Sequence, residues 1–218
     1  MKKGRKVRLW KIVPIKCMDF VGNFLYEKKL MKEVNDMNQE AGTYEITTER
    51  LRLRLFTEQD ANEVQKLCNN INIYKTTLYI PNPYTVDDAL LWMQNHHKNF
   101  DEDKGYELAI TNKETGELLG AIGLSHNARH KQGELAYWIG EPFWNKGYGT
   151  EAAKAMLQFA FEVKGMHKVF ARFFSSNPAS GKIMEKIGMV EEGLLKEHIL
   201  KDGHFEDLYV YGIVNPKY

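Results

Sequence analysis

The sequence of 218 residues predicts an α/β fold of the α+β kind, in which helices flank one mixed, mostly antiparallel sheet of about seven strands. Two periodic patterns predict it: apolar residues at every second position mark strands, and apolar residues three or four positions apart mark helices. The patterns follow one another as strand, two helices, three strands, helix, strand, helix and two strands. Short turns join several of these strands, which favours antiparallel neighbours.

The first elements are a strand and two helices. Leucine alternates with arginine over residues 51–55, which is the period of a strand with one buried face. Thr57 is a candidate N-cap for one helix, and Thr85, with Asp88 three residues later, is a candidate N-cap for a second. Residues 70–84 between them carry tyrosines and prolines, and we expect a loop that either packs on the domain or closes over a substrate.

Three strands follow the two helices. Residues 106–111, 118–124 and 134–139 have the apolar and β-branched character of strands, and residues 112–117 end in a threonine–glycine turn signal. Pro142 lies just after the third strand and ends the ladder, because proline has no N–H to donate. An antiparallel meander is therefore expected in this part of the chain.

The remaining pattern alternates helix and strand before a final hairpin. The expected elements are a helix that ends near 164–165, a strand over 167–174, a helix from Asn177-Pro178 to Gly188, and strands over about 194–200 and 205–214. Asp202-Gly203 between the last two strands is a strong signal for a two-residue turn, since both residue types tolerate a positive φ. The chain is thus expected to close with two antiparallel strands.

Charge divides the chain into two parts. The formal net charge is +1, but the first forty residues hold ten Lys or Arg against five acidic residues, which leaves 20 against 24 in the remainder. We therefore expect a basic N-terminal extension over residues 1–41, helical or disordered, and one domain over residues 42–218. The near-neutral balance and the lack of a basic stripe argue against nucleic acid as a partner.

The cysteines and the N-terminal segment indicate a cytoplasmic protein. Cys17 and Cys68 stand far apart, without the density of a secreted disulfide scaffold or the spacing of metal ligands. Charged residues and Pro14 interrupt the apolar stretch 10–26, so it fits neither a signal peptide nor a membrane-spanning helix. The seven histidines show no metal-binding spacing either, so we expect no metal and place the histidines at the surface or near the substrate.

A glycine-containing loop carries the strongest chemical signal. Residues 144–150 read Trp-Asn-Lys-Gly-Tyr-Gly-Thr and lie between a strand and an apolar helix. The first N–H groups of a helix have no partner within it and attract a phosphate group that can approach closely. Gly147 and Gly149 remove side-chain obstruction, while Lys146 adds a positive charge and Thr150 a hydroxyl. A pair of glycines can also serve a tight turn or close helix packing. The position of this pair between a strand and an apolar helix favours the diphosphate interpretation instead.

This loop resembles the hallmark of the GNAT family of acetyltransferases, which reads Gln or Arg, two residues, Gly, one residue, then Gly or Ala. Trp144 stands here in place of Gln or Arg. Further segments carry the resemblance: Thr48–Arg54, Glu134–Ile139, Gly147–Ala152, Asn177–Ser180 and Glu185–Met189. The resemblance covers most of residues 48–218 and is closest to the branch that contains ribosomal-protein N-terminal acetyltransferases. It implies a sheet whose strands splay apart at the cofactor site.

The resemblance implies acetyl-CoA as the co-substrate. The main chain around Trp138 and Ile139 would hydrogen-bond its pantetheine arm, and Asn177, which could equally be a helix cap before Pro178, would contact the same cofactor. The residues expected to bind acetyl-CoA are Trp138, Ile139, Lys146, Gly147, Tyr148, Gly149, Thr150 and Asn177.

Two residues are expected to move protons. Glu134 begins the strand that leads into the loop and is the expected general base, with an ion pair or substrate positioning as the alternative role. The family's usual acid is a tyrosine, and Met184 occupies its position here. Ser180, one turn earlier, is the expected proton donor to the departing thiolate, with helix capping as its alternative role.

The expected reaction is direct attack of an amine on acetyl-CoA. An α-amine of pKa about 7.8 is neutral in about one molecule in seven at pH 7, against about one in 2,500 for a lysine side chain. A weak or water-mediated base is therefore sufficient for an N-terminal substrate. The branch points to a protein or peptide N-terminus, such as that of a ribosomal protein. One alternative is a small amine as acceptor (polyamine, amino sugar or antibiotic), and another is a non-catalytic module that binds acetyl-CoA. We expect the protein to be a monomer or homodimer and to have no membrane partner.

Overall fold

The computed structural model describes residues 44–217, so the predicted extension 1–41 lies outside the described residues. The strands are β1 (Glu45–Thr47), β2 (Leu51–Leu55), β3 (Gly105–Asn112), β4 (Leu118–Ser125), β5 (Gln132–Ile139), β6 (Lys168–Phe174), β7 (Val190–Lys201) and β8 (His204–Val214). The helices are α2 (Ala61–Cys68), α3 (Ile71–Thr76), α4 (Val86–Met93), α5 (His96–Asp101), α6 (Tyr148–Gln158) and α7 (Pro178–Lys186). Three short segments complete the set: 3-10 helices η1 (Glu58–Asp60) and η2 (Glu141–Phe143), and π-helical η3 (Phe159–Val163).

Within residues 44–217, eight strands form one sheet in the order β1-β2-β3-β4-β5-β6-β8-β7. Only β5 and β6 pair in parallel, and the other neighbours are antiparallel. The predicted mixed, mostly antiparallel sheet flanked by helices is therefore confirmed, and β1 adds an eighth strand. The final hairpin turns at Asp202 and Gly203, whose φ values of 51° and 79° are those of the expected two-residue turn.

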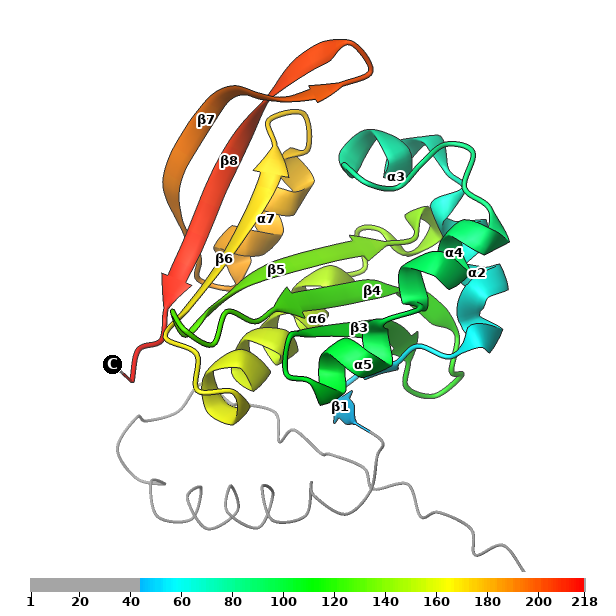
Figure 1. The fold of residues 1–218 in the computed structure, drawn as a ribbon, viewed down its shortest axis with the longest axis horizontal. Helices are drawn as coiled ribbons and strands as arrows, with labels where there is room; N and C mark the ends of the chain where they lie inside the picture. Colours follow the sequence, from blue (N-terminus) through cyan, green and yellow to red (C-terminus); the bar gives the residue numbers. More distant parts are fainter. Residues whose placement is uncertain (1–43, 218) are drawn as a thin grey trace, which may run out of the picture.

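Helices cover both faces of the sheet (Figure 1). On β3, Leu108 and Ile110 join a core with α6, whereas Ala109 between them joins a second core with α2 and α4. Alternate residues of a strand point to opposite faces, so α6 packs on one side and the α2–α4 pair on the other. Ala152 and Met156 of α6 are fully buried in the first core, together with Leu53 and Leu135 of the sheet.

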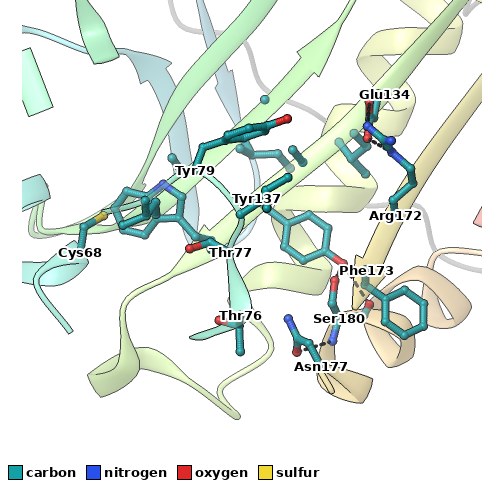
Figure 2. A pocket seen from close by; sticks show the side chains of 18 of the residues that line it. Cys68, Thr76, Thr77, Tyr79, Glu134, Tyr137, Arg172, Phe173, Asn177 and Ser180 are labelled. Atoms are coloured by element: carbon teal, nitrogen blue, oxygen red, sulfur yellow. Dashed lines mark hydrogen bonds and ion pairs between the residues drawn. The ribbon is translucent and has the colours of Figure 1, made fainter. Parts of the chain in front are cut away.

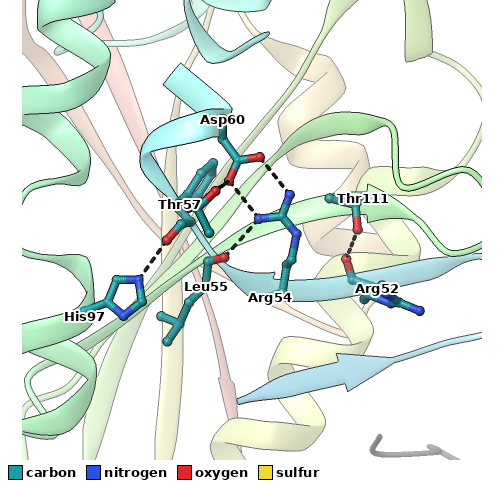
Figure 3. A network of polar contacts seen from close by, with 8 residues as sticks. Arg52, Arg54, Leu55, Thr57, Asp60, His97 and Thr111 are labelled. Atoms are coloured by element: carbon teal, nitrogen blue, oxygen red, sulfur yellow. Dashed lines mark hydrogen bonds and ion pairs between the residues drawn. The ribbon is translucent and has the colours of Figure 1, made fainter. Parts of the chain in front are cut away.

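Polar contacts tie the end of β2 to the first helical turn (Figure 3). The Arg54 guanidinium donates to both carboxylate oxygens of Asp60, at 2.8 and 2.7 Å. That carboxylate also accepts the Thr57 backbone N–H at 2.8 Å, so Thr57 and Asp60 open the 3-10 turn before α2. Burial raises the pKa of Asp60, but the hydrogen bonds from Arg54 and Thr57 outweigh it and hold the pKa below its usual value.

Candidate active site

The loop between β5 and α6 presents backbone N–H groups at the start of the helix. Its N-cap residue, Gly147, has a left-handed φ of 82°, and Asn145 is also left-handed, with φ 61°. Left-handed residues in short turns are typical of backbone nests that bind anions. The Glu151 N–H donates to the Gly147 carbonyl at 3.0 Å, so the N–H groups of residues 148–150 precede the first intrahelical hydrogen bond. The loop therefore has the geometry of a diphosphate site.

An arginine just before β2 braces this loop. Arg50 donates through Nη1 to the Lys146 carbonyl at 2.9 Å and through Nε to the Glu151 carboxylate at 2.7 Å. Its guanidinium also lies over the ring of Tyr148, 4.7 Å from the centroid, and that ring packs against the first core. Burial raises the pKa of Glu151, but hydrogen bonds from Thr48 and Arg50 bring it below its usual value. The loop pattern alone did not reveal Arg50 as a partner.

Trp144 supports the loop from the side of β5. Its indole Nε1 donates to the Ile139 carbonyl at 2.6 Å, which ties the first loop position to the end of the strand. A carbonyl oxygen has two lone pairs, so the Ile139 oxygen can still accept an amide N–H from a ligand. The Trp138 carbonyl faces β4 instead, and a Cβ added at Gly120 would lie only 2.2 Å from it.

The sheet opens beyond the start of β5. Pairing between β5 and β6 covers only Gln132–Glu134 and Lys168–Phe170, although both strands run further. Figure 1 shows the two strands diverging from this point. A cleft of about 780 Å³ lies here, lined by residues from the α3–α4 region, β3–β6, α7 and the last hairpin. The predicted splay at the cofactor site is therefore present.

The cleft brings together some of the predicted residues and not others. Glu134, Trp138, Asn177 and Ser180 all line it. The loop residues 146–150 do not, because they follow the far end of β5. Strand β5 therefore connects the loop 144–150 to the cleft. An extended pantetheine arm would need a path of this kind between the two.

Ser180 lies against the half-buried phenol of Tyr137 (Figure 2). The Tyr137 hydroxyl is 3.1 Å from the Ser180 Oγ and donates to the Ser180 carbonyl oxygen at 3.0 Å. Burial raises the pKa of Tyr137 to about 12, with the Ser180 hydrogen bond acting in the opposite direction, so the phenol stays protonated near neutral pH. Asn177 caps α7 by accepting the Ser180 N–H at 3.4 Å. Met184, which occupies the position of the family's usual acid, is only 1% exposed.

Glu134 is held by an arginine. Arg172 of β6 donates to its two carboxylate oxygens at 2.7 and 3.0 Å (Figure 2). The Glu134 backbone N–H donates to the Ser125 Oγ at 2.8 Å, which fixes the strand beside the point of divergence. The ion pair considered as the alternative role is thus formed, and each oxygen keeps a lone pair for a substrate proton.

A second carboxylate in the cleft was missed by the sequence analysis. Glu107 of β3 lines the cleft, and its Oε2 is shielded from solvent with no hydrogen-bond partner among residues 44–217. Burial raises the pKa of this carboxyl. The available signal was an acidic residue inside an otherwise apolar strand, Tyr-Glu-Leu-Ala-Ile.

The outer wall of the cleft comes from residues expected to form a loop. Part of that segment is the helix α3, and its last residue together with residues 77–81 lines the cleft. The Tyr74 hydroxyl of α3 donates to Asp202 in the last hairpin, and the Lys201 Nζ lies 4.0 Å from the Tyr74 ring centroid. The last hairpin therefore contacts α3 across the chain.

One histidine differs from expectation. His96 is only 4% exposed, packed 4.6 Å from Trp92 and 5.6 Å from Phe56 between ring centroids. Burial, helped by His97, lowers its pKa to about 4, so the ring is neutral at physiological pH. Of the two expected placements, the surface is wrong for His96, which packs instead on Trp92, a residue that lines the cleft.

Comparison with known proteins agrees with this geometry. The chain matches the acetyltransferase (GNAT) domain family over residues 50–190. It is 29% identical over 174 residues to the uncharacterized N-acetyltransferase YoaA of Bacillus subtilis, covering 79% of this chain and 97% of that protein. It is 24% identical over 185 residues to the [Ribosomal protein uS5]-alanine N-acetyltransferase of Escherichia coli, covering 78% and 91%.

A solved structure shares the fold. The spermidine N-acetyltransferase of Vibrio cholerae, in complex with CoA and spermine, superposes with a TM-score of 0.67 at 24% identity, covering 78% of this chain and 99% of that one. The chain therefore belongs to the GNAT family of acetyltransferases. It is an N-acetyltransferase that uses acetyl-CoA as its co-substrate.

No helix within residues 44–217 is long and apolar enough to cross a membrane. No group of three or more His, Cys, Asp or Glu side chains in the same range is arranged to hold a metal ion.

Proposed function

We propose that this enzyme acetylates the N-terminal α-amine of a protein or peptide. The observation that carries the proposal is the composition of the cleft. Its walls are largely apolar and aromatic, with Leu91, Trp92 and Phe173 among them, and its acidic residues are Asp88, Glu107 and Glu134. Such a lining suits the side chains of a peptide that presents one cationic group.

Two of these three carboxylates already have partners. Asp88 forms a capping box with Thr85, and Glu134 is paired with Arg172. Of these three carboxylates in the described lining, only Glu107 has a shielded oxygen, Oε2, without a hydrogen-bond partner. A polyamine carries several positive charges along its length and would call for several free carboxylates, whereas an α-ammonium needs one. The cleft thus favours a ribosomal-protein-type acceptor, like that named for the Escherichia coli relative, over a spermidine-type acceptor.

The reaction we propose is a direct transfer. The neutral amine nitrogen attacks the thioester carbonyl, the tetrahedral intermediate loses its carbon–sulfur bond, and the thiolate takes up a proton. Glu134 would accept the proton that the amine releases, and Ser180 would supply the proton to the thiolate. The Tyr137 hydroxyl beside the Ser180 Oγ can replace the proton that Ser180 gives up.

The donor half of the site follows β5. Lys146, Gly147, Tyr148, Gly149 and Thr150 would hold the diphosphate through backbone N–H groups, because the helix N-terminus is positive there. The main chain at Ile139 would hydrogen-bond the pantetheine arm, whereas the Trp138 carbonyl faces β4 and is directed away from that arm. Asn177, which lines the cleft, would contact the same arm. Arg50, whose side chain is 45% exposed beside the loop, adds a second cation to Lys146.

A competition experiment tests the acceptor. The full chain is incubated with acetyl-CoA, a peptide carrying a free α-amine and an internal lysine, and an equal concentration of spermidine. Mass spectrometry then locates the acetyl group. We expect acetylation of the α-amine before the lysine or spermidine. Preferential acetylation of spermidine would refute the proposal, as would preferential modification of the lysine.

A further inference from the structure

Glu107 stands out because it is a carboxylate within an apolar strand. It lies on β3 between Tyr106 and Leu108, both of which are buried in the first core. Its own side chain points to the opposite face, toward the cleft. Its Oε2 is shielded from solvent and has no hydrogen-bond partner among residues 44–217. Burying a carboxylate without a partner is costly, so a lasting arrangement of this kind suggests a ligand that supplies one.

Two glycines make room for this carboxylate. A Cβ at Gly105, two residues earlier on β3, would lie 3.1 Å from the Glu107 Oε1. A Cβ at Gly123, its cross-strand partner on β4, would lie 3.5 Å from the Glu107 Cγ. Gly123 in turn pairs with Ala136 on β5, so the row from Glu107 to β5 carries no large side chain. The floor of the cleft is open between Glu107 and the splayed strand.

The position of Glu107 fits the path of an acceptor. Paired residues of adjacent strands share a face, so Glu107, Gly123 and Ala136 line one row, with Glu134 two residues from Ala136 on the same face of β5. Glu107 is two strand spacings from β5, about 10 Å between Cα atoms. A ligand nitrogen placed between Glu107 and β5 would be within reach of the Glu107 side chain. The same nitrogen would lie close to β5, the strand along which the thioester would be held.

The other charges of the cleft favour the Glu107 side for a cation. Arg172 is paired with Glu134, so an ammonium near that carboxylate also meets a guanidinium. Asp88 is engaged by the backbone N–H and hydroxyl of Thr85, at 2.8 and 2.6 Å. Burial raises the pKa of Glu107, as is usual for a carboxylate without a counter-ion, and a bound ammonium would supply that counter-ion.

We propose that Glu107 is the acceptor-binding residue, whose carboxylate receives the substrate ammonium through a charge-assisted hydrogen bond before acetyl transfer. This inference rests on the proposed amine acceptor and assigns its recognition to one side chain. A charge-assisted hydrogen bond in a shielded site is worth about a tenfold to hundredfold change in affinity. Loss of this hydrogen bond should lower the affinity for the acceptor and leave the affinity for acetyl-CoA unchanged.

The test compares Glu107→Gln with Glu114→Gln, a control at an exposed turn residue outside the cleft. Steady-state thiol release gives KM for the peptide and for acetyl-CoA separately. We expect Glu107→Gln to raise the peptide KM about tenfold or more, with the acetyl-CoA KM within twofold of wild type. The control should change neither. An unchanged peptide KM, or an equal rise in both KM values, would overturn the inference.

Direct binding separates recognition from folding. With CoA present in place of acetyl-CoA, Glu107→Gln should weaken binding of the free-amine peptide but leave binding of the N-acetylated peptide unchanged, since the latter has no ammonium. Its melting temperature should equal or exceed that of wild type, because the substitution removes a half-buried charge that has no counter-ion among the described residues. Equal weakening of both peptides would assign Glu107 a structural role and contradict the inference.

The outcome for Glu107 is separable from that for the acceptor class. If wild-type enzyme ignores the peptide and acetylates spermidine, the proposed function fails on wild type alone. The KM ratio between wild type and Glu107→Gln is then measured with spermidine, and a ratio near one overturns the Glu107 assignment as well. Should Glu107→Gln not fold, Glu107→Asp keeps the charge on a shorter side chain and should raise only the acceptor KM.

Discussion

Replacing Gly120 with alanine tests how β4 positions the strand that leads to the cofactor loop. Gly120 pairs with Ile139 at the last position of the β4–β5 ladder. A Cβ there would lie 2.2 Å from the Trp138 carbonyl oxygen and 3.0 Å from the Ile139 Cα. A carbon–oxygen contact needs about 3.3 Å, so the two strands must separate by about 1 Å. Both obstructing atoms are backbone, which leaves no side chain to move aside.

The size of the effect follows from that displacement. Overpacking of this kind costs about 1–3 kcal/mol of stability. A misplacement of about 1 Å in groups that orient a substrate can cost about a hundredfold in rate, so we expect kcat/KM for acetyl-CoA to fall by about ten- to a hundredfold. A ten- to hundredfold loss in kcat/KM corresponds to about 1.4–2.7 kcal/mol of transition-state stabilisation, which is of the same order as the loss in stability.

Urea unfolding and thiol-release kinetics measure the two effects. Gly193→Ala is the matched control, since a Cβ there meets nothing within 4 Å. It should leave both stability and kcat/KM near wild type. If Gly120→Ala also retained wild-type stability and acetyl-CoA kinetics, the close approach of β4 and β5 would be refuted, and with it the placement of the cofactor arm along β5.

Three further substitutions give distinct signatures. Ser180→Ala should lower kcat by about a hundredfold with little change in KM, while Ser176→Ala, at an exposed position, should not; full kcat in the first variant would remove Ser180 as the proton donor. Glu134→Gln should lower turnover most at low pH, and a kcat/KM profile equal to wild type from about pH 6 to 9 would exclude it as the base. His96→Phe should reduce the fall in the free energy of unfolding as the pH is lowered from 6.5 toward 4. The folded pKa of His96 is about 4 against 6.5 unfolded, so its stabilising contribution is complete above pH 6.5 and is lost as pH falls toward 4, by about 3 kcal/mol in all. An equal pH dependence of unfolding in the two proteins would contradict the buried, neutral ring.

Elements with a long or strong local pattern could be predicted from the sequence. The alternation over 51–55, the apolar stripe of α6 and the Asp202-Gly203 turn are each encoded by neighbouring residues. The elements missed were β1, α3 and α5, which span three, six and six residues. Segments this short complete too few periods to be distinguished from loops.

The candidate site was predictable where function depends on a local motif. The loop 144–150 is such a motif, because its glycines and the following helix are contiguous in the chain. Arg50 and Glu107 were missed because their importance depends on tertiary contacts: one lies 96 residues from its carbonyl partner, and the other gains its character from burial beside Gly123. The ion pair of Glu134 depends in the same way on Arg172, a residue of a different strand.

The measurement that tests the central claim most directly uses two peptides of one sequence, with the α-amine free in one and already acetylated in the other. Each is incubated with acetyl-CoA and the full chain, and release of the CoA thiol is followed. We predict release with the free peptide and only the background rate with the blocked one. Equal release from the two, or binding of acetyl-CoA with no turnover on the free peptide, would contradict the account.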